Sequence, residues 1–244
     1  MENYLPMAIT VFFFATVQSL FGVGLLVFGT PTLLLLGYSF VDTIAALLPA
    51  SLVISFMQAW QGKEQIGAFK KSIPFYAVPF IVLGLALVLG KVLVMDVKFL
   101  VGVLLVCTAI IRFNAKVQQV MAAVLKKHTK VYLMLTGLVH GLSNMGGGFL
   151  TMLATSIYQD KESTRANIAY GYFVFALSQI LVLAALHREA FGVHCLILAA
   201  VALLTHRTVG NLIYMKSSQR VYQLLITIFI FAYGVVLIGQ KLFY

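Results

Sequence analysis

Residues 141–149 read Gly-Leu-Ser-Asn-Met-Gly-Gly-Gly-Phe, and they interrupt a run from 131 to 159 that carries no charged side chain. Glycine is the poorest common helix former after proline. A backbone released from its helix is also costly where water cannot reach it. Three consecutive glycines in so apolar a run therefore predict a break inside the segment, at which the freed backbone N–H groups serve some purpose.

The composition is that of a membrane protein. Hydrophobic residues make up 61% of the chain and charged residues 10%, with a mean hydropathy of +1.01, whereas soluble domains carry roughly 25% charged residues. About 20 apolar residues cross a bilayer as a helix. The runs without charge predict an all-α integral membrane protein, and they cover 3–41, 43–62, 72–90, 99–111, 131–159, 166–187, 190–206 and 221–240.

The charged residues and the cysteines exclude several classes of protein. The net charge of +10 is dispersed among short loops, which indicates loops that face anionic lipid rather than a nucleic-acid site. Cys107 and Cys195 are isolated in apolar runs, so we expect neither a disulfide nor a metal site. All seven acidic residues fall at the ends of predicted spans or in loops. A cation pump with a deep carboxylate is therefore not expected, and no cofactor is implied.

The glycine break recurs in the first half of the chain. An offset of 122 residues, half of the chain, places Gly24 on Gly146 and Gln18 on His140. We therefore predict two repeats, 1–115 and 131–244. Residues 116–130 join them as an amphipathic interfacial helix, with Val117, Val120 and Val124 on one face. The same offset pairs Gly22 with Asn144, Ala45 with Asn167 and Pro49 with Gly171.

The distribution of Lys and Arg indicates how the two long broken runs are arranged. If each long run crossed the membrane once, the two sides would hold 10 and 7 basic residues. If each run instead enters and returns, one side holds 13, in 61–72, 112–130, 159–165 and 206–220, against four. Cytoplasmic loops are enriched in Lys and Arg, which favours re-entrant hairpins over long broken helices. Each hairpin is then followed by three transmembrane helices, so the second repeat is inverted and both termini face outward.

Two helices that begin inside the membrane, after Gly24 and after Gly146, would point free N–H groups at one cavity. The chemistry of such a cavity suits a small anion. His140 is an intramembrane ionisable group and hence a functional candidate; Tyr170 and Tyr172 belong either to the cavity or to the helix interface. The predicted substrate-binding residues are Gln18, Gly22, Gly24, His140, Ser143, Asn144, Gly146, Gly147, Gly148, Arg165 and Asn167, whereas Pro31, Pro49 and Gly171 are expected to shape helices.

The glycine-rich stretches at 21–37 and 141–150, each followed by an Ala-rich span, resemble the motifs of the sulfite exporter TauE/SafE family. Leu25, Leu26 and Asn144 stand where that family tends to have glycine. The resemblance covers essentially the whole chain. It implies a multi-pass permease of the bacterial inner membrane that exports sulfite, a sulfonate or a related small anion.

The leading hypothesis is thus a secondary transporter of a small sulfur-containing anion, in which one inverted half rocks against the other. An anion channel of the same architecture is the alternative. An intramembrane enzyme built on His140 and Ser143 is a further one, although no nucleophile motif surrounds Ser143. Membrane lipids are expected partners, and a lipid-facing homodimer is compatible with the sequence.

Overall fold

The computed structural model describes residues 4–67, 69–92, 113–158 and 160–216, with shorter pieces between 102 and 111 and between 218 and 239. All regular elements in these residues are helical. Two of the expected spans, 99–111 and 221–240, fall in the stretches that are described only in part. The other four match helical segments long and apolar enough to cross a membrane, namely Phe40–Gln61, Phe69–Leu89, Lys161–Leu186 and Val193–Lys216.

The first long apolar run folds as a hairpin. Helix α1 (Leu5–Phe21) ends at Gly22, whose φ of 75° lies in the left-handed region that favours glycine. The chain then enters a π-helical turn, η1 (Leu25–Gly29), and a short helix, α2 (Thr30–Leu35). The returning leg packs against α1, with the rings of Phe14 and Phe28 at 5.9 Å. The run therefore reverses direction at its glycine break.

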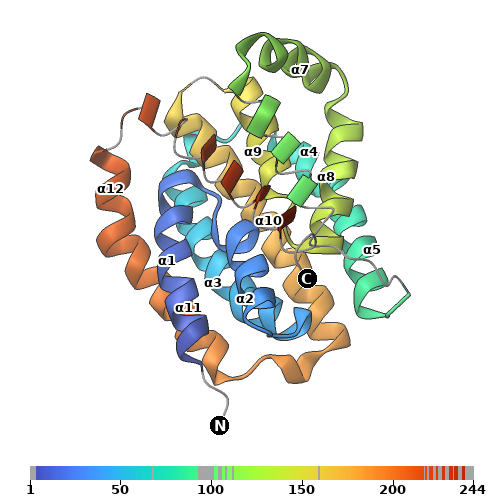
Figure 1. The fold of residues 1–244 in the computed structure, drawn as a ribbon, viewed down its shortest axis with the longest axis vertical. Helices are drawn as coiled ribbons and strands as arrows, with labels where there is room; N and C mark the ends of the chain where they lie inside the picture. Colours follow the sequence, from blue (N-terminus) through green and yellow to red (C-terminus); the bar gives the residue numbers. More distant parts are fainter. Residues whose placement is uncertain are drawn as a thin grey trace.

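The second broken run folds in the same way. Helix α8 (Thr129–Ser143) ends at Asn144, which has a left-handed φ of 60°, and α9 (Gly147–Ile157) returns beside it. The Tyr132 hydroxyl donates to the carbonyl of Phe149 across the two legs at 2.9 Å. In Figure 1, α1 starts near the N-terminus at the bottom, whereas α8 starts at the opposite end, below α7. The two hairpins therefore enter the molecule from opposite ends.

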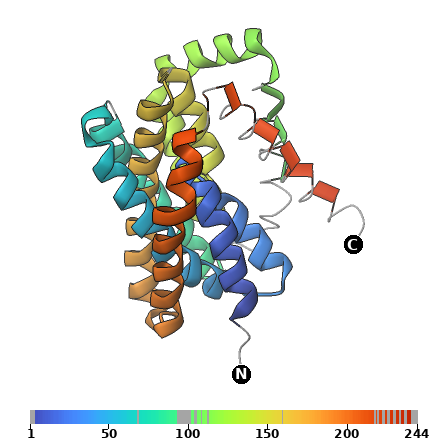
Figure 2. The ribbon, with the colours of Figure 1, turned by 90° about the vertical axis from the view of Figure 1, so that its left-hand side faces the viewer.

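Two long helices, α3 (Phe40–Gln61) and α10 (Lys161–Leu186), pack against each other in the middle of the molecule. Helices α4 (Phe69–Tyr76) and α5 (Val78–Leu89) pack on α8, and α11 (Val193–Thr205) packs on α1 and α3. Small residues allow these approaches. A Cβ on Gly84 of α5 would lie 2.9 Å from the carbonyl oxygen of Leu138 on α8. The first leg of each hairpin therefore packs on a neighbouring helix, α8 on α5 and α1 on α11, and Figure 2 shows α1 running beside α11.

Three residues were expected to shape helices, and the structure places all three within helices. Pro31 is the second residue of α2, which continues directly from η1. Pro49 lies inside α3. Gly171 of α10 faces the side chain of Leu150 on α9, which a Cβ would approach to 2.5 Å.

An amphipathic helix joins the two hairpin-containing parts of the chain. Helix α7 spans Ala115–Lys127, and its N-terminus is capped by the Asn114 side chain. Val117, Val120 and Val124 are exposed, whereas Leu125 is buried. The helix begins one residue before the expected range of 116–130, and Thr129 already belongs to α8. The exposed valines lie on the same helix as Lys116, Lys126 and Lys127, and its position at the membrane surface stays a prediction.

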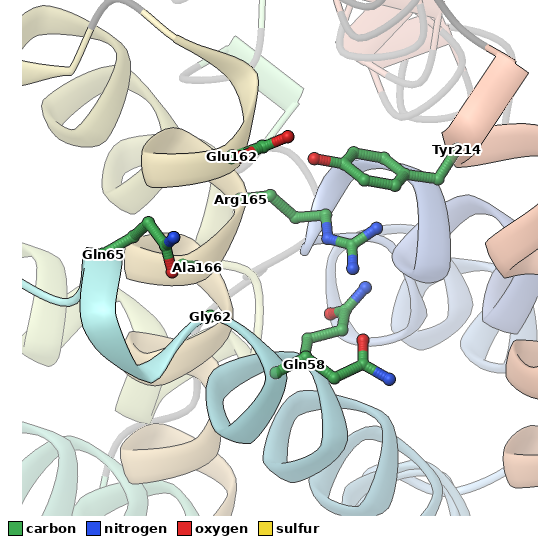
Figure 3. Close-up of a pocket in the computed structure, with 8 residues that line it drawn as sticks. Gln58, Gly62, Gln65, Glu162, Arg165, Ala166 and Tyr214 are labelled. Carbon is green, nitrogen blue, oxygen red and sulfur yellow. The ribbon is translucent and has the colours of Figure 1, made fainter.

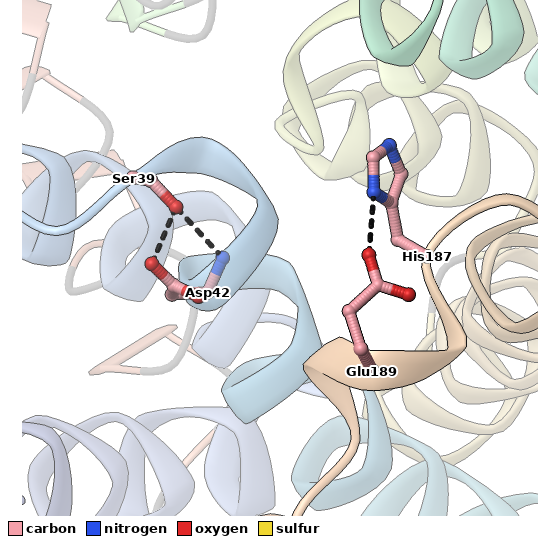
Figure 4. Close-up of polar contacts among 4 residues, drawn as sticks. All are labelled: Ser39, Asp42, His187 and Glu189. Carbon is pink, nitrogen blue, oxygen red and sulfur yellow. Dashed lines mark hydrogen bonds and ion pairs between the residues drawn. The ribbon is translucent and has the colours of Figure 1, made fainter.

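The described acidic residues lie at helix ends, as the sequence predicts. The Ser39 side chain caps α3 by accepting from the N–H of Asp42 at 3.1 Å, and His187 contacts Glu189 at 3.1 Å beyond the end of α10 (Figure 4). Glu189 belongs to the 3₁₀ turn η3 (Arg188–Ala190). The others are Glu64 in the 3₁₀ turn η2 (Lys63–Gln65) and Asp160 and Glu162 at the start of α10.

Candidate anion site at the hairpin tips

The tip of the first hairpin is closed by Gln18. Its side-chain oxygen accepts from the N–H of Leu25 at 3.2 Å and from the Ser51 hydroxyl at 3.1 Å. Its amide nitrogen donates to the Ser51 carbonyl and the Ser55 hydroxyl at 3.1 and 2.9 Å. From α3, Gln58 donates to the carbonyl of Gln18 at 3.0 Å. Both polar atoms of the Gln18 side chain are therefore used inside the protein.

The tip of the second hairpin has the same plan with different residues. His140 Nδ1 accepts from the N–H of Gly146 at 3.2 Å, as Gln18 accepts at the first tip. From α10, Gln179 donates to the carbonyl of His140 at 3.4 Å, as Gln58 does from α3. Because Nδ1 is an acceptor, the neutral His140 ring carries its proton on Nε2.

Several buried polar atoms near this second tip have no hydrogen-bond partner among the described residues. They include the Tyr172 hydroxyl, His140 Nε2, Asn144 Oδ1, Gln179 Oε1 and Thr136 Oγ1. The Gln179 side chain faces the imidazole, but outside hydrogen-bonding geometry. A buried polar group without a partner costs about 1–3 kcal/mol. Such a group can be satisfied by a small movement of a neighbouring side chain, by bound water or by a ligand.

Two of these atoms are hydrogen-bond donors next to the start of α9. The Tyr172 hydroxyl points at Gly147, so closely that a Cβ at position 147 would overlap its oxygen. The rings of His140 and Tyr172 lie 6.2 Å apart. A helix begins with free N–H groups and a positive dipole end. The start of α9, the Tyr172 hydroxyl and His140 Nε2–H together form a buried set of donors that suits an anion.

In this conformation the two tips are in contact. Asn144 Nδ2 donates to Thr30 Oγ1 at 2.8 Å and so joins the second hairpin to the first. Protein atoms, not open space, face the Cα atoms of the tip glycines for which the contacts are described, namely Gly22, Gly24, Gly146 and Gly147. Gly148 is buried in the first turn of α9. Among the described residues, the tip glycines are therefore packed against protein atoms, and the open cavity expected between the tips stays a prediction.

Two other predicted site residues serve local structure. The Ser143 hydroxyl donates to the carbonyl of Val139 and accepts from the N–H of Met145, which closes the turn. The Asn167 side chain donates to the carbonyl of Gln65 at 2.8 Å and accepts from the N–H of Gly67 at 3.1 Å. It therefore anchors the loop after α3, and neither side chain faces the donors at the tips.

Arg165, near the start of α10, lines a cavity of about 150 Å³. In Figure 1, α10 begins at the end of the molecule that also carries α7. Its guanidinium lies 3.5 Å from the centre of the Tyr214 ring and donates to the Ser19 carbonyl at 3.3 Å. Figure 3 shows the Arg165 side chain extending between Tyr214 and Gln58. The lining residues are Gln58, Gln61, Gly62, Gln65, Glu162, Arg165, Ala166 and Tyr214.

Helices long and apolar enough to span a bilayer, with two hairpins that meet at their tips, define an all-helical multi-pass membrane protein. The family model of the sulfite exporter TauE/SafE matches residues 7–237, so the chain belongs to this family of transporters. No curated protein and no solved structure matches the chain.

Proposed function

We propose that the protein exports a small sulfur-containing anion, sulfite or an organosulfonate, across the bacterial inner membrane. The observation that carries this proposal is the pair of buried donors, Tyr172 and His140, that lack an acceptor beside the first turn of α9. Hydrogen bonds to a charged acceptor are worth about 1.5–3 kcal/mol. An oxyanion between these donors would satisfy both and would not require a buried lysine.

The hairpins support an inverted repeat. Gln18 and His140 accept an N–H of the break, and Gly22 and Asn144 both adopt left-handed backbone. Both correspondences have the offset of 122 residues that the sequence suggests. The hairpins also start at opposite ends of the molecule (Figure 1), which is the arrangement expected of two repeats related by inversion in a membrane.

Contact between the tips supports a carrier over a channel. The Asn144–Thr30 hydrogen bond and the buried tip glycines leave the donors enclosed by protein. An anion reaches them after the tips separate, as alternating access requires. The end of the molecule with the Arg165 cavity carries the basic loops and faces the cytoplasm in this proposal, so the cavity lies on the side from which exported anions enter.

Thermal stability of the purified protein with sulfite, sulfate, thiosulfate, sulfoacetate, taurine and chloride tests the proposal. We expect a sulfur oxyanion to raise the unfolding temperature, because it binds the folded state preferentially. Taurine, a zwitterion with the same sulfonate group, is the control for net charge. In proteoliposomes the same anion should show saturable flux that is stimulated by anion on the opposite side.

The proposal would be overturned if no sulfur oxyanion produced either a stability shift or flux. Large unitary currents would establish the channel instead. Gly147 is a poor position for testing the site by mutation. Any side chain there would overlap Tyr172, so loss of transport could not be separated from misfolding. Substitution of Tyr172 itself avoids this problem.

A further inference from the structure

Ser19, in the last turn of α1, connects the first hairpin to the Arg165 cavity. Its carbonyl accepts from Gln58 at 2.8 Å and from Arg165 at 3.3 Å. Its hydroxyl donates to the carbonyl of Ala15 at 2.6 Å and contacts His206 Nδ1 at 2.9 Å. Because the hydroxyl proton is used on Ala15, His206 Nδ1–H is the donor to Ser19. An additional proton on this histidine would therefore reside on Nε2.

His206 occupies an unusual place in the backbone. It is 1% exposed and begins a π-helical turn, η4 (His206–Gly210), between α11 and α12 (Asn211–Lys216). The absence of a side chain on Gly210 lets this turn approach Ser19 closely. Single π turns inside helices are frequent at functional sites, and here the turn places a titratable ring beside the tip of the first hairpin.

The charged groups that face His206 are positive. Arg165 from α10 and Arg207 from η4 itself both act electrostatically on the ring. Helix α1 contains no titratable residue, and those of α11, His194 and Cys195, lie at its other end. From α12, Tyr214 lies against Arg165. An imidazolium at position 206 would thus be repelled by two guanidiniums. Glu162, which lines the cavity together with Arg165, is the carboxylate on this side, and an anion in the cavity would add a further negative charge.

We propose that the cavity beside Arg165 binds a sulfonate or a similar oxyanion, and that His206 binds a proton together with it. The inference deepens the transport function proposed above and rests on it. Guanidinium and carboxamide N–H groups are suitable donors to such an anion. The cavity volume of about 150 Å³ corresponds to roughly five waters at ~30 Å³ each, enough for a small oxyanion.

The anion and the proton favour each other because the charge of the anion offsets the repulsion of His206 by Arg165. Such coupling is reciprocal. An anion in the cavity raises the affinity of His206 for a proton, and a proton on His206 raises the affinity for the anion. A transported anion would therefore be accompanied by a proton.

Calorimetric titration of the full-length protein with methanesulfonate, in buffers of different ionisation enthalpy, counts protons taken up per anion. This probe stays a monoanion between about pH 5.5 and 8, where an exposed histidine titrates. We expect proton uptake by the wild type and an affinity that falls by up to about tenfold per pH unit as the pH rises. Arg165→Gln should bind at least tenfold more weakly.

His206→Gln keeps an N–H donor for Ser19 and should bind the probe without proton uptake. His194→Gln, at the other end of α11, is the matched control and should behave as the wild type. Methanesulfonate binding without proton uptake in the wild type, or uptake that persists in His206→Gln, would overturn the inference and leave the transport function intact. Wild-type affinity in Arg165→Gln would exclude the cavity, and no binding of any sulfur oxyanion would instead refute the transport function.

Discussion

Substitution of Tyr172 by Phe should change the empty and the anion-bound protein in opposite directions. The Tyr172 hydroxyl is fully buried and has no partner among the described residues, which costs the empty protein about 1–3 kcal/mol. Removing one oxygen leaves the ring and its contacts with His140 and Phe175 in place. We therefore expect the empty variant to unfold at a higher temperature than the wild type.

The anion-bound form should lose stability relative to the wild type. A hydrogen bond from the hydroxyl to a charged oxygen is worth about 1.5–3 kcal/mol, which corresponds to an affinity about 10- to 150-fold weaker in Tyr172→Phe. Measuring the unfolding temperature as a function of anion concentration gives both the stability of the empty protein and its affinity for the anion. The midpoint without anion should rise, and the increase caused by the anion should shrink.

Tyr170→Phe is the control, because Tyr170 lies in the same helix and its hydroxyl donates to the Lys70 carbonyl at 2.8 Å. It should leave the anion-induced increase unchanged. The reasoning would be refuted in part if Tyr172→Phe lowered the stability of the empty protein, since the hydroxyl would then have a protein partner. It would be refuted entirely if the anion-induced increase also stayed at the wild-type value.

Substitutions at three further residues test the hairpins and the start of α10. Gln18→Met removes the acceptor of the Leu25 N–H and should lower the free energy of unfolding by roughly 1–3 kcal/mol in detergent; unchanged stability would contradict the closing role of Gln18. Asn144→Ala should lower the free energy of unfolding more than Asn144→Gly, because alanine in left-handed backbone costs about 1–2 kcal/mol. Equal unfolding temperatures of the two variants would argue against this strain. The Ser163 N–H holds the pKa of Asp160 below its ordinary range, so the ionised side chain stabilises the fold above about pH 4 and this contribution is lost as the pH falls through the lower native value. Asp160→Asn keeps the cap and should weaken the dependence of the unfolding midpoint on acid pH, and an unaltered profile would show that Asp160 does not contribute.

Much of the fold follows from local sequence. The apolar runs predict the four described spans, and the glycines at 22–24 and 146–148 predict the two reversals. The correspondence of Gly22 with Asn144 is visible in the sequence because both residue types tolerate left-handed backbone. The π turns at 25–29 and 206–210 have no comparable signal, since they depend on packing against α1.

The site is less predictable because it depends on contacts between distant segments. Tyr172 is one of two tyrosines that the sequence does not distinguish. The structure separates them, with Tyr172 against Gly147 and Tyr170 bonded to Lys70. Tyr214 carries no local signal at all, because its contact with Arg165 joins two helices about 50 residues apart. Loop 61–72 was expected to be basic and cytoplasmic. The hydrogen bond that Asn167 donates to the Gln65 carbonyl in this loop could not be predicted, because the two residues are far apart in the sequence.

The packing of the first legs has a consequence for how the protein moves. Helix α8, which opens the second half, lies on α5 of the first half, whereas α1 of the first half lies on α11 of the second. The hairpin of each half therefore packs against a helix of the other half. If one half of the sequence moved as a rigid body, the packing of α8 on α5 and of α1 on α11 would both be lost. The moving unit is therefore expected to be a hairpin together with the helix of the other half on which it packs.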